Sequence, residues 1–166
     1  MIVGTPPTSA PTEPVVPANS PVLPRSIRTI LLATDLSGAS EEAARQAIAL
    51  CRLLSARLLV VNVIDPDRLS DTTVPGPASA RIDQHRTRRE GPLLDLVERG
   101  RSQGIDGTYL LWTGEAGPGI VAAAEAEGAD LIVVGTRGRG RAGRFLLGSV
   151  SDYVIYHAGC PVLIAR

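Results

Sequence analysis

The sequence predicts an α/β fold with an open parallel sheet and helices on both of its faces. Short apolar runs alternate with segments of helical periodicity in the order βαβαβαβαβ. Parallel strands require crossover helices, and right-handed crossovers place these helices on both faces of the sheet. Aromatic residues make up only 3% of the chain, so the core must consist of Val, Leu, Ile and Ala. Such a core suits a parallel sheet that is buried on both faces.

Five short apolar runs are predicted to form the strands. They are Ile30–Ala33, Leu58–Ile64, Tyr109–Trp112, Leu131–Val134 and Pro161–Ile164. The fourth run contains no polar residue, which predicts a strand buried on both faces.

Four helices are predicted between these strands. The first begins after the turn Ser37–Ser40, because Glu41 and Glu42 favour a helix N-terminus. Two others cover Ile120 to Glu127 and Ser149 to about His157. The remaining one is left open between two alternatives, since it either begins near Pro92 or is a longer helix kinked there. The polar stretch from Asp65 to about Arg81 is predicted to be a long connection.

Composition limits the domain organisation and the partners. Residues 1–25 hold seven of the 13 prolines and are predicted to be a disordered tail, so residues 26–166 form the domain. Formal net charge is zero, which argues against nucleic acid and anionic membranes as partners.

No apolar run reaches the roughly 18 residues of a membrane span, and a cytoplasmic location is expected by default. The cysteines, Cys51 and Cys160, lie in apolar contexts and are interpreted as buried small residues.

The segment Gly135–Ser149 is the most informative part of the sequence for function. It leaves a buried strand, contains five glycines and enters a helix at Gly148–Ser149. The first N–H groups of a helix lack internal partners and can bind phosphate oxygens. The alternative is a flexible surface loop with Ser149 as a simple N-cap. We favour a phosphate site because ligands of open α/β sheets bind at the carboxyl ends of the strands.

Four arginines, Arg137, Arg139, Arg141 and Arg144, follow one another closely in this segment. They could clamp a triphosphate, although for Arg139 and Arg141 a solvated loop is an equally good interpretation.

This segment resembles the universal stress protein family. Members carry Gly, two residues, Gly, nine residues and then Gly-Ser or Gly-Thr, a spacing that Gly135, Gly138, Gly148 and Ser149 match. The resemblance extends over about residues 27–166 and includes Asp35 with Ser37, the segment 63–66, the segment 128–135 and the segment 160–164.

The resemblance implies a Rossmann-like sheet with strand order 3-2-1-4-5, which places Asp35 near the glycine loop. It implies binding of ATP or another adenine nucleotide, with Mg²⁺ as a companion of ATP, in a regulatory protein of the stress response. Asp35 would lie beside ribose and adenine, and Val63 would contact the base. The full set of implied nucleotide-binding residues is Ala33, Asp35, Val63, Val134, Gly135, Arg137, Gly138, Gly148, Ser149, Val150 and Ser151. A homodimer through the last strand is also implied.

No catalytic residue is predicted. The sequence has no nucleophile elbow and no cluster with metal-ligand spacing. His157 is interpreted as a helix C-terminal residue and His85 as a surface residue. Three alternatives stay open, namely a slow ATPase, a protein that binds cyclic AMP, and a nucleotide-free interaction module of the same fold.

Overall fold

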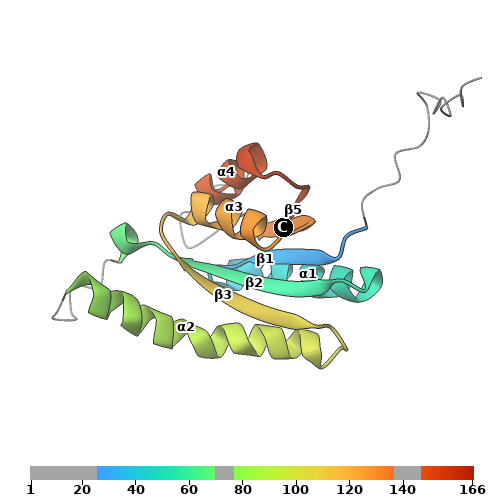
Figure 1. The fold of residues 1–166 in the computed structure, drawn as a ribbon, viewed down its shortest axis with the longest axis horizontal. Coiled ribbons are helices and arrows are strands. Elements are labelled where there is room, and N and C mark those ends of the chain that lie inside the picture. The colour runs from blue at the N-terminus through green and yellow to red at the C-terminus, as the bar shows by residue number, and fades with distance from the viewer. Residues whose placement is uncertain (1–25, 70–76, 137–146) are drawn as a thin grey trace, which may run out of the picture.

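The computed structural model describes residues 26–69, 77–136 and 147–166, and in these ranges the chain forms one five-stranded parallel sheet (Figure 1). The strand order is β3-β2-β1-β4-β5, as predicted. The strands are β1 (Thr29–Ala33), β2 (Arg57–Ile64), β3 (Gly107–Thr113), β4 (Leu131–Gly135) and β5 (Val162–Ala165).

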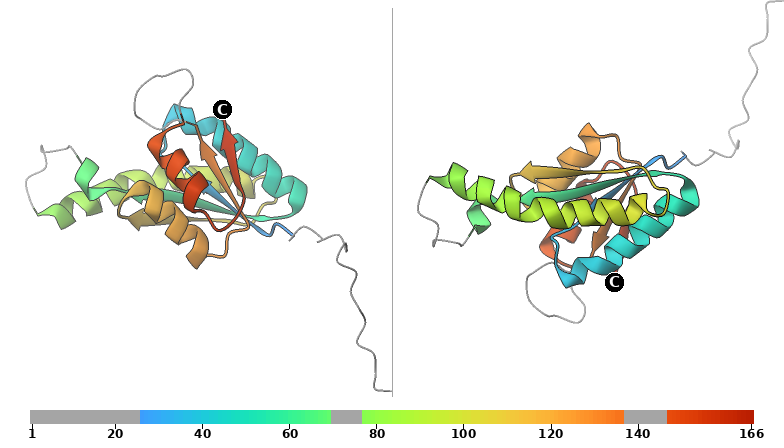
Figure 2. Two further views of the ribbon diagram at one scale, coloured as in Figure 1. Left: turned by 90° about the horizontal axis from the view of Figure 1, so that it is seen from above. Right: turned by 90° about the horizontal axis from the view of Figure 1, so that it is seen from below.

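Helices cover both faces of this sheet (Figure 2). Those on one face are α1 (Glu41–Leu54) and α2 (Ala78–Arg101), and those on the other are α3 (Ala116–Ala126) and α4 (Ser149–His157). Two short 3₁₀ turns, η1 (Gly38–Ser40) and η2 (Pro66–Arg68), follow the carboxyl ends of β1 and β2. The fold class is therefore the predicted one, with helices on both faces.

The core divides into two layers because successive side chains of a strand point to opposite faces. In β1, Ile30 and Leu32 pack toward α1 and α2, whereas Leu31 and Ala33 pack toward α3 and α4. Every residue of β1 and of β4 is buried. The two central strands therefore form a rigid base on which the loops at their ends are built.

Two helices differ from their predicted bounds. Helix α2 begins at Ala78 and contains Pro92, so the start near Pro92 is wrong and the helix is the longer one. Its first half is polar and has no buried residue among those described, and it therefore lacks the periodicity that would have revealed it. Helix α3 begins at Ala116, one turn early, although its first turn holds Gly117 and Gly119. The connection after β2 is correspondingly shorter than predicted.

The glycines of α3 are explained by close packing. A Cβ atom at Gly117 would lie 2.8 Å from the ring of Tyr153 in α4. A Cβ atom at Gly119 would lie 3.0 Å from Trp112 and 3.1 Å from Val63. Small residues thus allow the backbone of α3 to approach both α4 and the carboxyl half of β2.

The amino ends of the strands are closed by a dense set of polar contacts. One carboxylate oxygen of Asp130 accepts hydrogen bonds from the backbone N–H groups of Arg28 and Thr29, at 2.8 and 3.0 Å. The Arg57 guanidinium donates to Thr29 Oγ1 and to the carbonyl oxygen of Glu127, both at 2.9 Å. These contacts tie the beginnings of β1, β2 and β4 together.

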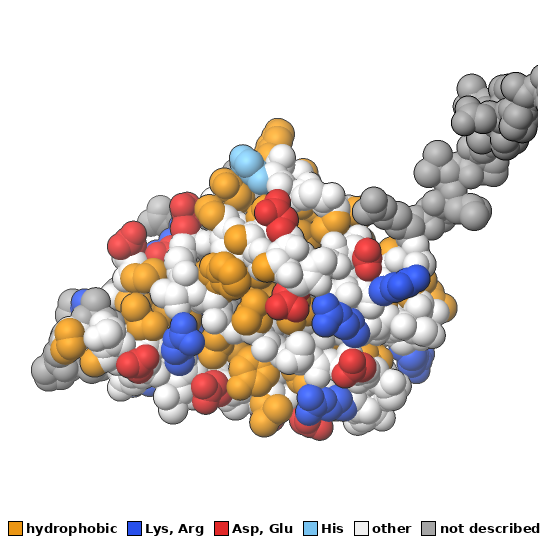
Figure 3. Space-filling view, viewed as in Figure 1, with side chains coloured by type: hydrophobic (Ala, Val, Ile, Leu, Met, Phe, Trp, Pro, Cys, Tyr) orange, Lys and Arg blue, Asp and Glu red, His pale blue; other side chains and the backbone are white. Residues whose placement is uncertain are grey.

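Charges of both signs are interspersed over the face drawn in Figure 3. Across the described ranges, no helix combines the length and apolar character that a membrane span requires. The predicted tail at residues 1–25 lies outside the described residues.

Candidate functional site

A cavity of about 410 Å³ lies at the carboxyl ends of the central strands. Strands β1 and β4 are neighbours with Ala33 in register with Val134, so the loops that follow them meet here. Every predicted site residue that the structure describes lines this cavity: Ala33, Asp35, Val63, Val134, Gly135, Gly148, Ser149, Val150 and Ser151. Arg137 and Gly138 lie outside the described residues, as do Arg139, Arg141 and Arg144.

The two ends of the glycine-rich segment are joined directly. The Gly148 N–H donates to the carbonyl oxygen of Thr136 at 2.9 Å, and Asp152 N–H donates to Gly148 at 2.9 Å. The second of these bonds is the first turn of α4. The N–H groups of Ser149, Val150 and Ser151 precede it and have no acceptor within the helix. They line the cavity and, with the helix dipole, form a place where an anion is stabilised.

The serine side chains at this helix end differ in their roles. Gly148, not Ser149, is the N-cap of α4, so the alternative of Ser149 as a simple N-cap is wrong. Ser149 is exposed at the cavity. Ser151 is buried, and its hydroxyl donates to the Gly148 carbonyl oxygen at 2.9 Å. Ser151 therefore fixes the helix start, and its hydroxyl proton is already engaged.

The turn after β1 presents Asp35 to the opposite side of the cavity. Its Oδ1 atom accepts hydrogen bonds from the Ser37 N–H at 3.0 Å and from the Ser37 hydroxyl at 2.6 Å. Leu36 has a φ of 61°, a left-handed conformation that is uncommon for such a residue. The Oδ2 atom is buried and has no hydrogen-bond partner among the described residues. A buried acceptor without a donor is costly, and a ligand hydroxyl would satisfy it.

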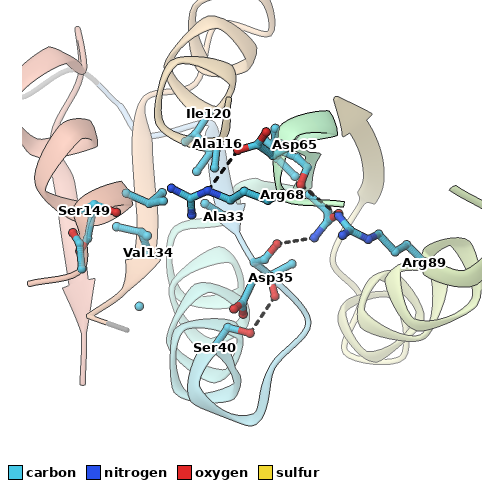
Figure 4. Close-up of a pocket in the computed structure, with 18 of the residues that line it drawn as sticks. Ala33, Asp35, Ser40, Asp65, Arg68, Arg89, Ala116, Ile120, Val134 and Ser149 are labelled. Atoms are coloured by element: carbon cyan, nitrogen blue, oxygen red, sulfur yellow. Dashed lines mark hydrogen bonds and ion pairs between the residues drawn. The ribbon is translucent and has the colours of Figure 1, made fainter. Parts of the chain in front are cut away.

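A buried polar network lies beneath this turn. Asn62 is 1% exposed, and its Nδ2 donates to the Thr34 carbonyl oxygen at 2.7 Å. Its Oδ1 accepts from Arg89 of α2 at 2.6 Å, and the same guanidinium nitrogen donates to the Val63 carbonyl oxygen at 3.0 Å. The hydroxyls of Thr34 and Ser40 lie 2.9 Å apart. This network fixes the end of β1, and hence Asp35, relative to β2 and α2 (Figure 4).

One wall of the cavity is apolar. Figure 4 shows Ala33 and Val134 on the sheet facing Ala116 and Ile120 on α3. Val63 completes this wall, and the close approach of α3 at Gly119 packs its side chain firmly. The arrangement suits the flat face of an aromatic ring, with polar groups only at the edges.

The chain matches the model of the universal stress protein family over residues 26–166. The chain belongs to this family. A universal stress protein of Thermus aquaticus is 39% identical over 142 residues, which cover 84% of this chain and 98% of that protein.

Solved structures agree with this assignment. A universal stress protein family member from Burkholderia pseudomallei is 30% identical, with a TM-score of 0.66 over 84% of this chain and 96% of that one. A universal stress protein in complex with cAMP has a TM-score of 0.58 at 24% identity, over 84% of this chain and 96% of that one. A universal stress protein from Archaeoglobus fulgidus in complex with dAMP has a TM-score of 0.59 at 24% identity, over 85% of this chain and 99% of that one.

Sequence reasoning missed several residues that line the cavity of this universal stress protein. They are Thr34, Ser40, Val61, Asn62, Asp65, Arg68, Leu69, Arg89, Ala116 and Ile120. Asn62 could have been noticed, because an amide inside an apolar strand indicates a buried hydrogen-bond network. Arg68 and Arg89 carry no such signal, since their positions depend on how η2 and α2 leave the sheet.

The cysteines and histidines lie outside the cavity. Burial raises the pKa of Cys51 to about 12. Cys160 is only half-buried, unlike the prediction, and burial is also the main cause that raises its pKa. His157 stacks on Tyr153 in the last turn of α4, and its Nδ1 lies 2.8 Å from the Tyr153 carbonyl oxygen. His85 of α2 is half-buried.

Proposed function

We propose that this universal stress protein binds an adenine nucleotide in the cavity at the carboxyl ends of β1 and β4 and acts as a regulatory protein in the stress response. One observation carries the proposal. Asp35, which has one carboxylate oxygen without a partner among the described residues, lines the same cavity as the first residues of α4, whose amides have no acceptor within the helix. A ligand that offers hydroxyl donors at one end and anionic oxygens at the other satisfies both.

The parts of a nucleotide fit this arrangement one by one. The base lies against the apolar wall that includes Val63 and Ile120. The ribose hydroxyls donate to Asp35, because a carboxylate without a donor is the acceptor that they need. The phosphate oxygens accept from the amides of Ser149 and Val150, helped by the dipole of α4. Gly135, Arg137 and Gly138 remain part of the predicted phosphate site.

We propose ATP as the ligand, with cyclic AMP as the alternative. The relatives solved with cAMP and dAMP support adenine as the base. In the described residues no group of three His, Cys, Asp or Glu could hold a metal ion. Mg²⁺ would therefore be bound mainly through the phosphate oxygens of ATP. A titration with ATP, AMP and cyclic AMP, with and without Mg²⁺, separates these ligands.

A cytoplasmic homodimer is part of the same proposal. Strand β5 lies at the edge of the sheet, and Val162, Leu163 and Ile164 are only half-buried. An apolar sheet edge is a liability unless a second strand covers it. Sedimentation velocity is expected to give the mass of a dimer, and a monomer at every concentration tested would contradict pairing through β5.

Ser149→Pro tests the binding site with little risk to the fold. Residue 149 is the first residue of α4, where proline is tolerated. Gly148 has φ −68° and ψ 152°, which is the conformation that a residue before proline prefers. The substitution removes one amide donor and one hydroxyl. A lost hydrogen bond to a charged group costs about 1.5 kcal/mol or more, so calorimetry is expected to measure roughly tenfold weaker ATP binding.

Ser149→Ala is the matched control, because it removes the hydroxyl and keeps the amide. Binding that is weakened clearly less by alanine than by proline supports the main-chain phosphate site. Equal binding of ATP by wild type and Ser149→Pro would exclude the amide from the site. No binding of any adenine nucleotide by the wild type would favour the nucleotide-free interaction module.

A further inference from the structure

The side chain of Arg68 lies inside the cavity described above, although η2, from which it comes, is remote from the glycine-rich segment in the sequence. Figure 4 shows the side chain extended across the cleft, with its guanidinium between Ala33 and Ala116 and directed toward Val134 and Ser149. It is 68% exposed and therefore crosses the cleft without filling it. A cavity of about 410 Å³ remains around it.

Asp65 holds Arg68 in this position through the Nε atom alone. The Asp65 side chain is 14% exposed, and its Oδ1 atom accepts a hydrogen bond from the Asp67 N–H at 3.0 Å. Its Oδ2 atom lies 3.3 Å from Arg68 Nε. The two Nη atoms of Arg68 have no protein partner within the described ranges. The Nη donors of the guanidinium thus face the cleft, while its Nε atom is held by Asp65.

The electrostatics of the cleft explain what this tip can bind. The N-terminus of α4 carries a partial positive charge, and the guanidinium directed toward it carries a full one. Two positive groups that face each other across a solvent-filled gap stabilise an anion placed between them. A guanidinium and main-chain amides are also the two donor types most often used for phosphate.

We propose that Arg68 contacts the phosphate group of the ligand and makes the cleft selective for nucleoside phosphates over nucleosides. This inference rests on the proposed function, since it concerns a ligand of the same site. Asp65 is the positioning residue, because its ion pair with Nε aims the Nη atoms at the helix N-terminus. Selectivity then comes from η2 as well as from the start of α4.

The opposing interpretation is that Arg68 only occupies the cleft and is displaced by any ligand. The two interpretations predict opposite changes in AMP affinity when Arg68 is truncated. If Arg68 is a mere occupant, its truncation improves the binding of adenosine and of AMP alike. If Arg68 contacts phosphate, truncation weakens the binding of AMP and leaves adenosine nearly unchanged.

The test is calorimetry of AMP and adenosine with wild type, Arg68→Gln, Arg68→Lys and Arg52→Gln. Arg52 is an exposed arginine of α1 and serves as the matched control for loss of a positive charge. We expect Arg68→Gln to weaken AMP binding roughly tenfold and adenosine binding less than twofold. Arg68→Lys keeps the charge without the planar guanidinium, and its AMP affinity is expected to lie between those of the wild type and Arg68→Gln. Arg52→Gln is expected to change neither affinity.

The outcomes separate this inference from the proposed function. Affinities for AMP and adenosine that rise or fall together in Arg68→Gln would overturn the role of Arg68 while the nucleotide site stands. A wild type that binds neither ligand would overturn both. The salt dependence of AMP binding provides a second readout, because removal of a cation that contacts phosphate reduces it.

Discussion

At the amino ends of the strands the polar groups are bonded to one another, whereas at the carboxyl ends a polar network supports residues that face a cavity. Asp130 accepts two hydrogen bonds at the start of β1, and Arg57 donates to Thr29 of β1 and to Glu127 at the end of α3. Asp35 at the other end keeps one carboxylate oxygen buried without a partner. The same residue types therefore join the chain at one end of the sheet and, in the proposed function, bind the ligand at the other.

The difference follows from the connections that the two ends carry. At the amino end, Arg28 of the segment entering β1 and Asp130 at the start of β4 meet directly. At the carboxyl end, the turn after β1 leads to α1 on one face, and the segment after β4 leads to α4 on the other. Departure to opposite faces leaves a crevice between adjacent strands, which is where open α/β sheets bind ligands.

The largest effect on stability is expected at the amino end. Asp130→Ala removes the acceptor of the Arg28 and Thr29 N–H groups, and Thr29 is buried. The free energy of unfolding is expected to fall by about 2 kcal/mol, while nucleotide affinity stays unchanged. Denaturant titration measures the first quantity and calorimetry the second. Asp130→Asn keeps an acceptor and is expected to lose clearly less stability; a large loss of affinity in either variant would contradict the separation of the two ends.

The opposite pattern is expected for Asp35→Asn. Asparagine can keep the Oδ1 bonds to Ser37, but it replaces the unpartnered oxygen with a donor. Affinity for AMP is expected to fall about tenfold, because a ribose hydroxyl loses its acceptor. The free energy of unfolding without ligand is expected to change by less than 1 kcal/mol. A variant that binds AMP normally but unfolds easily would make Asp35 a structural residue instead.

The smallest effect is expected from a charge beside the cavity but outside it. Glu41 accepts two hydrogen bonds from Arg99, at 2.6 and 3.2 Å, and this interaction lowers the pKa of Glu41. A lowered pKa in the folded state adds stability above the unfolded pKa, near 4.5, and this stability is lost as the pH falls through the folded pKa. The pair is half-exposed, so solvent screening limits its contribution to a few tenths of a kcal/mol.

Glu41→Gln tests this pH dependence. Its free energy of unfolding is expected to be slightly lower than that of the wild type at pH 7, and the difference is expected to shrink below pH 4.5 and to vanish as the pH falls through the lowered pKa of folded Glu41. Affinity for AMP is expected to be the same in both proteins. A difference in stability that persists at acid pH would mean that the charge of Glu41 is not its cause.

The fold class could be predicted from local signals, and resemblance to the family implied the strand order and about half of the cavity lining. An apolar run such as Leu131–Val134 shows a buried strand, and the spacing from Gly135 to Ser149 matches the family. The unpredicted parts depend on tertiary contacts. The first half of α2 has no apolar periodicity, and the start of α3 contains residues that usually end helices. Gly117 is favoured there because Tyr153 of another helix leaves no room for a side chain.

The role of Arg68 could not be predicted for a related reason. Its neighbours in the sequence, Asp65 to Asp67, indicate only a polar turn after β2. The direction of the side chain is set by the Asp65 carboxylate, which both caps η2 and pairs with Nε. The position of a long side chain depends on such a tether, and spacing in the sequence does not reveal it.

The most direct test of the central claim is an NMR titration of the backbone amides with AMP. We expect the largest chemical-shift changes at Ser149, Val150 and Ser151, with further changes at Leu36 and Val63. The amides of Arg28 and Thr29 at the amino end are expected to stay unchanged. Changes confined to the amino end, or none at the start of α4, would contradict a nucleotide site between β1 and β4.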